Sequence, residues 1–371
     1  MPGNRKPVIA ITVGDPTGVG PEIVVKALAS GLLDAHCRPL VLGRPAILKL
    51  AAHKSALSIA IVEVNSIAEW HSESERPSLV GTPKLWCLSA GTADADNATR
   101  PIVDRRGGQL AFDCLVLATK MALEGTVDAI VTSPLHKVAL LEAGHDWPGH
   151  TELLAHLCGV KEHAMMLYLP PGRPRHGGQV GFGVVHVTLH MALREVFAHL
   201  TIDAVGEKIQ LANDVFVRIR KAMGVPGVPR IAVAALNPHA GESGRFGLEE
   251  QTIIEPAVMK AREKQIDVVG PLPVDTLMPK AVDGGFDAVV AMYHDQGHIA
   301  LKLLDMFDAV NVTLGLPIVR TSVAHGTAHD IAWQNRAESS GMIQAVLTAA
   351  RLTEAPAKRQ KADTVLTHIN A

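Results

Sequence analysis

The feature of this sequence that most restricts its fold is a regular alternation of short apolar runs with longer amphipathic segments. In the first half, residues 8–13 and 127–134 are runs of strand length rich in β-branched residues. Residues 21–32 and 109–124 between them carry apolar side chains at helical spacing, and Pro21 stands in the first turn of the earlier one. Strands that alternate with helices are joined by crossover connections, so the pattern predicts an α/β fold with a mostly parallel sheet.

The second half of the chain repeats this order of elements. No fixed-period repeat or low-complexity tract interrupts it.

Over the whole chain, further strands are expected at 38–43, 59–64, 84–89, 164–169, 181–189, 230–236, 288–293 and 309–316. Further helices are expected at 47–55, 203–223, 248–264 and 339–352. A Pro/Gly/Arg-rich insertion at 170–179 predicts an exposed loop.

Composition narrows the class of protein. At 371 residues, with 47% hydrophobic and 19% charged residues, the chain can build a large core. A formal net charge of -2 argues against a nucleic-acid or membrane partner held by bulk electrostatics. The four cysteines form no CxxC pair, and no apolar run is long enough for a signal-peptide core or a membrane span. We therefore expect a cytoplasmic protein that binds neither nucleic acid nor membrane.

Three of the expected strands run out into a histidine. They end in "VVHVTLH" at His190, "ALNPH" at His239 and "AMYH" at His294. Ligands of open α/β sheets bind outside the carboxyl ends of the strands, so these imidazoles can converge although they lie far apart in the sequence. A single histidine at a strand end is more often a turn residue. Three in equivalent contexts make a divalent metal site as plausible as three turn residues, and the candidate ions are Zn, Mg, Mn, Co or Ni.

Other polar residues fit an anionic substrate. "PGHTELL" at 148–154 predicts a helix start, where His150 and Thr151 suit a phosphate or carboxylate, although ordinary capping is the better explanation of Thr151 taken alone. Lys302, Asn311 and Arg320 cluster around one expected strand and together suit a phosphate, although each alone is as readily a surface residue.

Two loops rich in small residues lead into helices. "VGDPTGVGPEI" contains Gly14, Gly18 and Gly20, whose spacing is not that of the dinucleotide fingerprint GxGxxG. "HGTAHDIA" at 325–332 is the second loop, and Asp330 within it is either a helix cap or an acceptor for a hydroxyl group.

Taken in order, these motifs resemble one enzyme family. "GDPTGVGPEI", "PGHTE", "LNPHAGE", "PVDTL", "AMYHDQGH", "VNVTLGLPIVRTS" and "HGTAHDIA" together resemble the 4-hydroxythreonine-4-phosphate dehydrogenases over residues 8–345. The resemblance implies the α/β fold of isocitrate and isopropylmalate dehydrogenases, with two intertwined lobes, a cleft between them and a homodimer whose active sites lie at the subunit interface. It places residues of about 135–300 in the metal and dimer lobe, and both chain ends in the cofactor lobe.

The resemblance also implies a role for each matching residue. His190, His239 and His294 would hold the metal, with one of the three supplied by the partner subunit. His150, Thr151, Lys302, Asn311 and Arg320 would bind substrate, and Asp275 and Lys302 would be catalytic. NAD, or NADP as the alternative, would be bound by Gly14, Asp15, Gly18, Gly20, His325, Gly326, Thr327 and Asp330.

The implied reaction is oxidation of a phosphorylated hydroxy acid to a β-keto acid that decarboxylates, within carbohydrate metabolism. "YHDQGHIALKLL" and "HDIAW" look closest to the D-threonate and D-erythronate 4-phosphate branch. Dehydrogenases of a terephthalate cis-dihydrodiol share "VVHVTLH" and "DQGHI" and are the alternative; a metal-dependent hydrolase and a non-catalytic binding module are the rivals from other classes. Ala324 and Trp333 depart from the family pattern beside the cofactor loop and leave the cofactor preference open.

Overall fold

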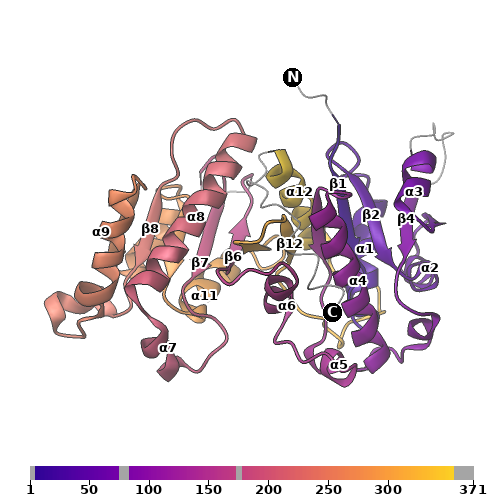
Figure 1. Cartoon of the computed structure of the whole chain (residues 1–371), viewed down its shortest axis with the longest axis horizontal. Coiled ribbons are helices and arrows are strands. Elements are labelled where there is room, and N and C mark those ends of the chain that lie inside the picture. The colour runs from indigo at the N-terminus through magenta and orange to yellow at the C-terminus, as the bar shows by residue number, and fades with distance from the viewer. Residues whose placement is uncertain (1–4, 75–82, 173–177, 355–371) are drawn as a thin grey trace. The chain divides into compact units, whose positions relative to one another are not determined.

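The structure is a computed structural model that describes residues 5–74, 83–172 and 178–354. The expected loop at 170–179 falls partly outside these ranges, and the C-terminal tail at 355–371 falls wholly outside them. The chain divides into two compact units, one built from residues up to 161 and from 316 onwards, the other from 162–315. Both are α/β units with mostly parallel sheets, which confirms the predicted fold class (Figure 1).

The first unit holds six parallel strands in the order β3-β4-β2-β1-β5-β12. Its central strand β1 is buried along its whole length, as expected for a strand covered on both faces. The strands are β1 (Val8–Thr12), β2 (Arg38–Gly43), β3 (Ala60–Val64), β4 (Lys84–Ser89), β5 (Ala129–Thr132) and β12 (Arg320–Val323). The helices are α1 (Gly20–Ala29), α2 (Pro45–Lys54), α3 (Ile67–Ser74), α4 (Arg105–Glu124), α5 (Lys137–Glu142), α6 (His150–Leu157) and α12 (Ser340–Glu354), with a short 3-10 helix η1 at Ala93–Asn97.

The second unit orders its strands β11-β6-β7-β10-β8-β9. Strand β6 runs antiparallel to both of its neighbours, and the remaining pairs are parallel. The strands are β6 (Ala164–Leu169), β7 (Phe182–His186), β8 (Ile231–Ala234), β9 (Val268–Leu272), β10 (Ala288–Ala291) and β11 (Val310–Leu314). The helices are α7 (Leu193–His199), α8 (Ile202–Ala222), α9 (Glu255–Glu263), α10 (Val274–Val282) and α11 (His294–Leu304). A left-handed turn, η2 (Pro238–Gly244), and a short π-helix, η3 (Glu250–Ile254), complete the unit.

The second unit begins later than the 135–300 range expected from the sequence. Helix α5 packs against α4 of the first unit, and α6 also contacts α4. These contacts keep residues 137–157 with the first unit, whose boundary falls after residue 161.

Local chemistry explains where two of the helices begin. The helix expected at 109–124 begins at Arg105, because the Asp104 side chain accepts a hydrogen bond of 2.9 Å from the Arg106 N–H and caps the helix. The helix expected at 248–264 is wrong in its first part, which is the π-helical turn η3. Its first residue, Glu250, is buried and bonded to the backbone that follows β8.

The described residues include no helix with the length and apolar character needed to cross a bilayer.

Candidate functional site

A cluster of histidines lies at the carboxyl ends of two neighbouring strands in the second unit. Strands β7 and β10 are parallel, with His186 paired to Ala291. His190 follows β7, and α11 begins at His294, so both predicted ligands leave the same edge of the sheet. Their ring centroids are 5.8 Å apart. The structure thus brings two of the three predicted metal ligands together.

Two further histidines belong to this cluster and were given no role from the sequence. His298 lies one turn after His294, and its ring stacks on that of His294 with centroids 3.7 Å apart and an angle of 10° between the planes. His186 Nε2 lies 3.1 Å from His298 Nδ1. The signal was present in the sequence, because each residue stands four positions from a predicted ligand.

Burial favours the neutral, metal-binding form of two of these imidazoles, His186 and His298. Burial, and after it the charges of His298 and His294, hold the pKa of His186 well below its usual value. Burial, followed by His294 and Lys302, lowers the pKa of His298 to about 4. His294 Nδ1 lies 2.6 Å from Asp295 Oδ1, an arrangement that leaves Nε2 for a ligand.

His239 lies on an unusual turn after β8. His239, Ala240, Gly241, Glu242 and Ser243 all have positive φ between 44° and 78°. Left-handed backbone costs roughly 1–2 kcal/mol for each residue with a side chain, so the four such residues here carry roughly 4–8 kcal/mol of strain. Strain of this kind persists where the surroundings over-determine it, which is typical of functional sites.

Within residues 5–74, 83–172 and 178–354 no group of three or more His, Cys, Asp or Glu side chains is placed to hold a metal. The donors present nevertheless fit a divalent ion, because imidazoles gather at the carboxyl edge of one sheet and burial keeps two of them, His186 and His298, in the neutral form. Completion of the set by a partner subunit remains a prediction.

Among the predicted substrate residues, the structure places His150 and Arg320 within electrostatic reach of one another in the first unit. Arg320 lies on β12, is 1% exposed and donates from Nη2 to Thr132 Oγ1 over 2.7 Å. Burial lowers the pKa of Arg320 to about 9, and Glu152 raises it in part. Burial, and then the charge of Arg320, hold the pKa of His150 well below its usual value. His150 begins α6 and is followed by Thr151, so a neutral imidazole, a buried guanidinium and a helix N-terminus are available to an anion.

The other predicted substrate and catalytic residues lie in the second unit. Lys302 is two turns along α11 from His294, and its charge contributes to lowering the pKa of His298. Asn311 lies on β11, where its Oδ1 atom is buried and finds no hydrogen-bond partner within the part of the chain that the structure describes. Asp275 is exposed in the first turn of α10, where its Oδ1 accepts the Thr276 N–H over 2.9 Å.

The two predicted cofactor loops lie against each other in the first unit. The Val19 N–H donates to the Thr327 carbonyl over 2.9 Å, and Thr17 Oγ1 lies 3.1 Å from His329 Nε2. A Cβ on Gly18 would meet the Thr327 carbonyl oxygen at 2.6 Å, so this approach requires glycine. Gly14 has φ 71°, and a Cβ at this position would likewise come too close to the Pro134 carbonyl oxygen. The remaining predicted members, Asp15, Gly20, His325, Gly326 and Asp330, lie on these same two loops.

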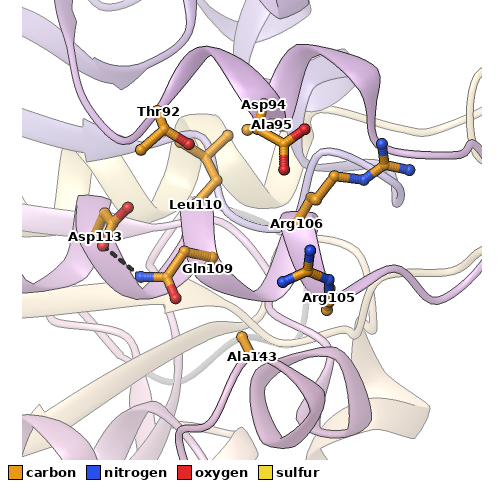
Figure 2. A pocket seen from close by; sticks show the side chains of 9 residues that line it. All are labelled: Thr92, Asp94, Ala95, Arg105, Arg106, Gln109, Leu110, Asp113 and Ala143. Carbon is orange, nitrogen blue, oxygen red and sulfur yellow. Dashed lines mark hydrogen bonds between the residues drawn. The ribbon is translucent and has the colours of Figure 1, made fainter.

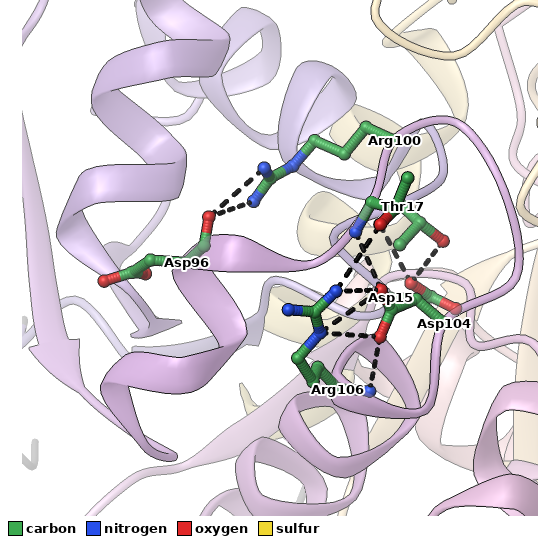
Figure 3. A network of polar contacts seen from close by, with 7 residues as sticks. Asp15, Thr17, Asp96, Arg100, Asp104 and Arg106 are labelled. Carbon is green, nitrogen blue, oxygen red and sulfur yellow. Dashed lines mark hydrogen bonds and ion pairs between the residues drawn. The ribbon is translucent and has the colours of Figure 1, made fainter.

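Asp15 is the polar centre of the first loop. It is buried, its Oδ1 accepts the Thr17 N–H and hydroxyl, and its Oδ2 has no hydrogen-bond partner among the described residues (Figure 3). Burial raises the pKa of Asp15, and its bonds to Thr17 oppose that rise. A buried acceptor without a partner fits a ligand that carries hydroxyl or amide donors, as a nicotinamide nucleotide does.

Trp333, one of the two departures from the family pattern, joins these loops. It has φ 63°, and its indole N–H donates to the Pro16 carbonyl over 3.1 Å. The Arg100 guanidinium lies 5.1 Å from the ring centroid. Neither Arg100 nor His329 was identified as a candidate from the sequence.

A hollow of about 200 Å³ lies beside the start of α4 (Figure 2). It mixes both signs of charge, and none of the predicted site residues lines it. Its lining is Thr92, Asp94, Ala95, Arg105, Arg106, Gln109, Leu110, Asp113 and Ala143.

Comparison with known proteins decides the family. The model of the pyridoxal phosphate biosynthetic protein PdxA family matches residues 35–349. The chain belongs to the PdxA family. This confirms the resemblance read from the motifs.

Two members of the PdxA family that carry different enzyme names have nearly the same sequence identity to this chain. The chain is 44% identical over 352 residues to the 4-hydroxythreonine-4-phosphate dehydrogenase of Geobacter metallireducens, covering 94% of this chain and 96% of that protein. It is 43% identical over 348 residues to the D-threonate 4-phosphate dehydrogenase of Salmonella typhimurium, covering 93% and 98%. The chain is therefore an oxidoreductase of the dehydrogenase type.

Solved structures agree with this assignment. A 4-hydroxythreonine-4-phosphate dehydrogenase from Klebsiella pneumoniae superposes with a TM-score of 0.78 at 40% identity, covering 94% of this chain and 100% of that one. This likeness confirms the expected dehydrogenase fold. A terephthalate 1,2-cis-dihydrodiol dehydrogenase from Burkholderia xenovorans is more distant, with a TM-score of 0.60 and 28% identity over 93% of this chain and 98% of that one.

Proposed function

We propose that this chain oxidises the hydroxyl group of a 4-phosphorylated hydroxy acid with NAD and a divalent metal, giving a β-keto acid that loses carbon dioxide. D-threonate 4-phosphate, D-erythronate 4-phosphate and 4-hydroxythreonine 4-phosphate are the candidate substrates. The buried Arg320 and the neutral His150 at the start of α6 carry the proposal, because a guanidinium, an imidazole and a helix N-terminus together suit a phosphate.

In the proposed mechanism, the residues of the chain bind and orient the substrate. Arg320 and His150 would anchor the phosphate, and Lys302 and Asn311 would contribute further donors to the substrate. Binding energy from this remote group positions the reacting carbon. His190, His239 and His294 would hold the metal, while Asp15 and the two small-residue loops would hold the nicotinamide nucleotide.

When bound, the metal supplies Lewis-acid stabilisation to the substrate oxygens and the nicotinamide accepts the hydride. The hydroxyl proton must leave as the hydride departs, and one proton must return to carbon after carbon dioxide is lost. Asp275 and Lys302 are the proposed carriers of these protons.

We also propose a homodimer that completes the site. Exposed apolar side chains occur on two helices of the second unit and directly after one of them, and a second copy would cover such side chains. They are Leu193 and Phe197 on α7, Ile299 and Leu303 on α11, and Met306 and Phe307 after it. If His239 comes from the partner, mixing inactive His239→Ala and His294→Ala proteins should restore activity through mixed dimers.

Absorbance at the NADH band tests the substrate class directly. The three phosphorylated acids and the terephthalate dihydrodiol would be offered in parallel with NAD or NADP, with and without a chelator. Turnover of a phosphorylated acid that is lost with the chelator supports the proposal. Turnover of the dihydrodiol alone would overturn the phosphate roles of His150, Lys302, Asn311 and Arg320.

A matched pair of variants distinguishes the loss of a specific contact with the phosphate from the loss of one positive charge anywhere on the protein. Lys302→Gln should raise KM for the phosphorylated acid, whereas Lys280→Gln, at an exposed position on α10, should leave it unchanged. Equal effects of the two substitutions would contradict the assignment of Lys302.

A further inference from the structure

The left-handed turn that carries His239 cannot persist on its own backbone preferences. His239 and Ala240 have φ of 52° and 53°, and Glu242 and Ser243 have φ of 44° and 58°. These side chains favour the right-handed region, so contacts from outside the turn must hold it.

One buried carboxylate makes those contacts at the point where the turn begins. Glu250 Oε1 accepts the backbone N–H of Leu236 over 2.8 Å and that of Asn237 over 2.7 Å. Glu250 Oε2 accepts the Asn237 side-chain amide over 3.0 Å, and Glu249 Oε2 accepts the same amide over 2.8 Å. Glu250 is 3% exposed, so these bonds are shielded from water. They therefore restrict the backbone of Leu236 and Asn237, which leads into the turn of His239.

The same carboxylate also packs against the middle of the turn. A Cβ on Gly241 would lie 2.7 Å from Glu250 Oε2, so only glycine fits there. Glu250 itself begins the π-helical turn η3 (Glu250–Ile254), a local distortion that is frequent at functional sites. The contact between Glu250 and the turn therefore joins two segments of irregular backbone, the π-helical turn η3 and the left-handed turn.

We propose that Glu250 is a positioning residue for His239: its carboxylate holds the left-handed turn in the conformation that presents the imidazole to the metal. This inference rests on the proposed function, in which His239 is a metal ligand. Glu250 acts through the backbone of Leu236 and Asn237 and does not itself touch substrate or metal.

The test is Glu250→Gln in the full-length protein, with Glu263→Gln at an exposed position on α9 as the control for loss of charge. An amide of the same shape accepts at one oxygen only and opposes its own N–H groups to the Asn237 amide. Zn²⁺ affinity, measured by chelator competition, is expected to fall 10- to 100-fold in Glu250→Gln, the range found for groups that orient metal ligands. The visible spectrum of the Co²⁺ form should change with it, and Glu263→Gln should match the wild type.

A second readout needs no metal. Hydrogen exchange of the Leu236 and Asn237 amides is expected to accelerate about tenfold or more in metal-free Glu250→Gln, because both lose an ionic acceptor. Adding Ala240→Gly to Glu250→Gln should recover Zn²⁺ affinity roughly fivefold, since glycine adopts φ 53° without the steric penalty. A purely structural loss would not be repaired by glycine in the turn.

Two results would overturn the inference. They are a Zn²⁺ affinity of Glu250→Gln within twofold of the wild type, and unchanged exchange of the two amides. His239→Ala in the same assay tests the underlying ligand assignment. If His239→Ala keeps the wild-type Zn²⁺ affinity, the ligand role fails and the role of Glu250 falls with it; if only His239→Ala weakens binding, the ligand role stands and Glu250 alone is refuted.

Discussion

Arg320 offers the sharpest test of the phosphate site, because its charge is buried. Burial lowers its pKa from 12.5 to about 9. At 1.36 kcal/mol per tenfold change, this corresponds to roughly 5 kcal/mol by which the fold disfavours the charged form. At pH 7 the guanidinium is protonated in both the folded and the unfolded state, so the folded protein carries this cost in full. The cost decreases only as the pH rises above about 9, where the folded state loses the proton before the unfolded state does.

Replacing Arg320 with methionine should therefore stabilise the protein when no anion is bound. We expect a gain of up to about 1–4 kcal/mol in the free energy of unfolding, the range observed when apolar residues replace a whole buried ion pair, because the charged neighbour Glu152 is only half-buried and stays solvated. The gain is smaller than the full burial cost, because the hydrogen bond from Nη2 to Thr132 Oγ1 and the attraction of Glu152 are lost as well.

Urea unfolding at pH 7 with and without inorganic phosphate measures both consequences. Phosphate at 100 times its dissociation constant should stabilise the wild type by about 2.7 kcal/mol and the Arg320→Met protein by much less. Arg336→Met, at an exposed arginine, is the control and should leave both values unchanged. An Arg320→Met protein that is less stable than the wild type without phosphate, or that keeps the full response to phosphate, would refute the reasoning.

Three further outcomes follow from the site. The pKa of His150 lies below its unfolded value, so the unfolded state binds the extra proton and stability falls as the pH drops below about 6.5. In His150→Gln the acid limb of a plot of stability against pH should be shallower by up to about 1.4 kcal/mol per pH unit, and an unchanged slope would contradict the shift. Gly18→Ala should raise KM for NAD at least tenfold, because the new methyl group collides with Thr327, and a normal KM would remove these loops from the cofactor site. His298→Phe keeps the stack on His294 but loses the contact with His186, whereas His298→Asn can keep that contact. Zn²⁺ titration should show weaker binding for His298→Phe than for His298→Asn, and the reverse order would make stacking the dominant effect.

Elements with a simple periodic signal were predictable from the sequence. The strands β2, β4 and β6 have the bounds expected from their apolar runs, because a short apolar run bounded by turn residues is the local signal of a buried strand. Helix α11 was not expected, although it begins at His294. Its first turn is histidine, aspartate, glutamine and glycine, a composition that resembles a loop, and tertiary contacts make it helical: Gln296 accepts from the Met292 N–H and donates to the Ala235 carbonyl.

The sequence by itself determined the α/β class, the family and the residue types of the site, because strand and helix periodicity and the motifs around each histidine are local properties of the chain. Only the tertiary structure decided which side chains meet: His186 and His298 join His294, Trp333 reaches Pro16, and Glu250 holds the turn of His239. The last case gives the physical reason. Left-handed backbone at residues with side chains opposes local preference, so the conformation comes from a buried carboxylate in the following helix and leaves no signal at the turn itself.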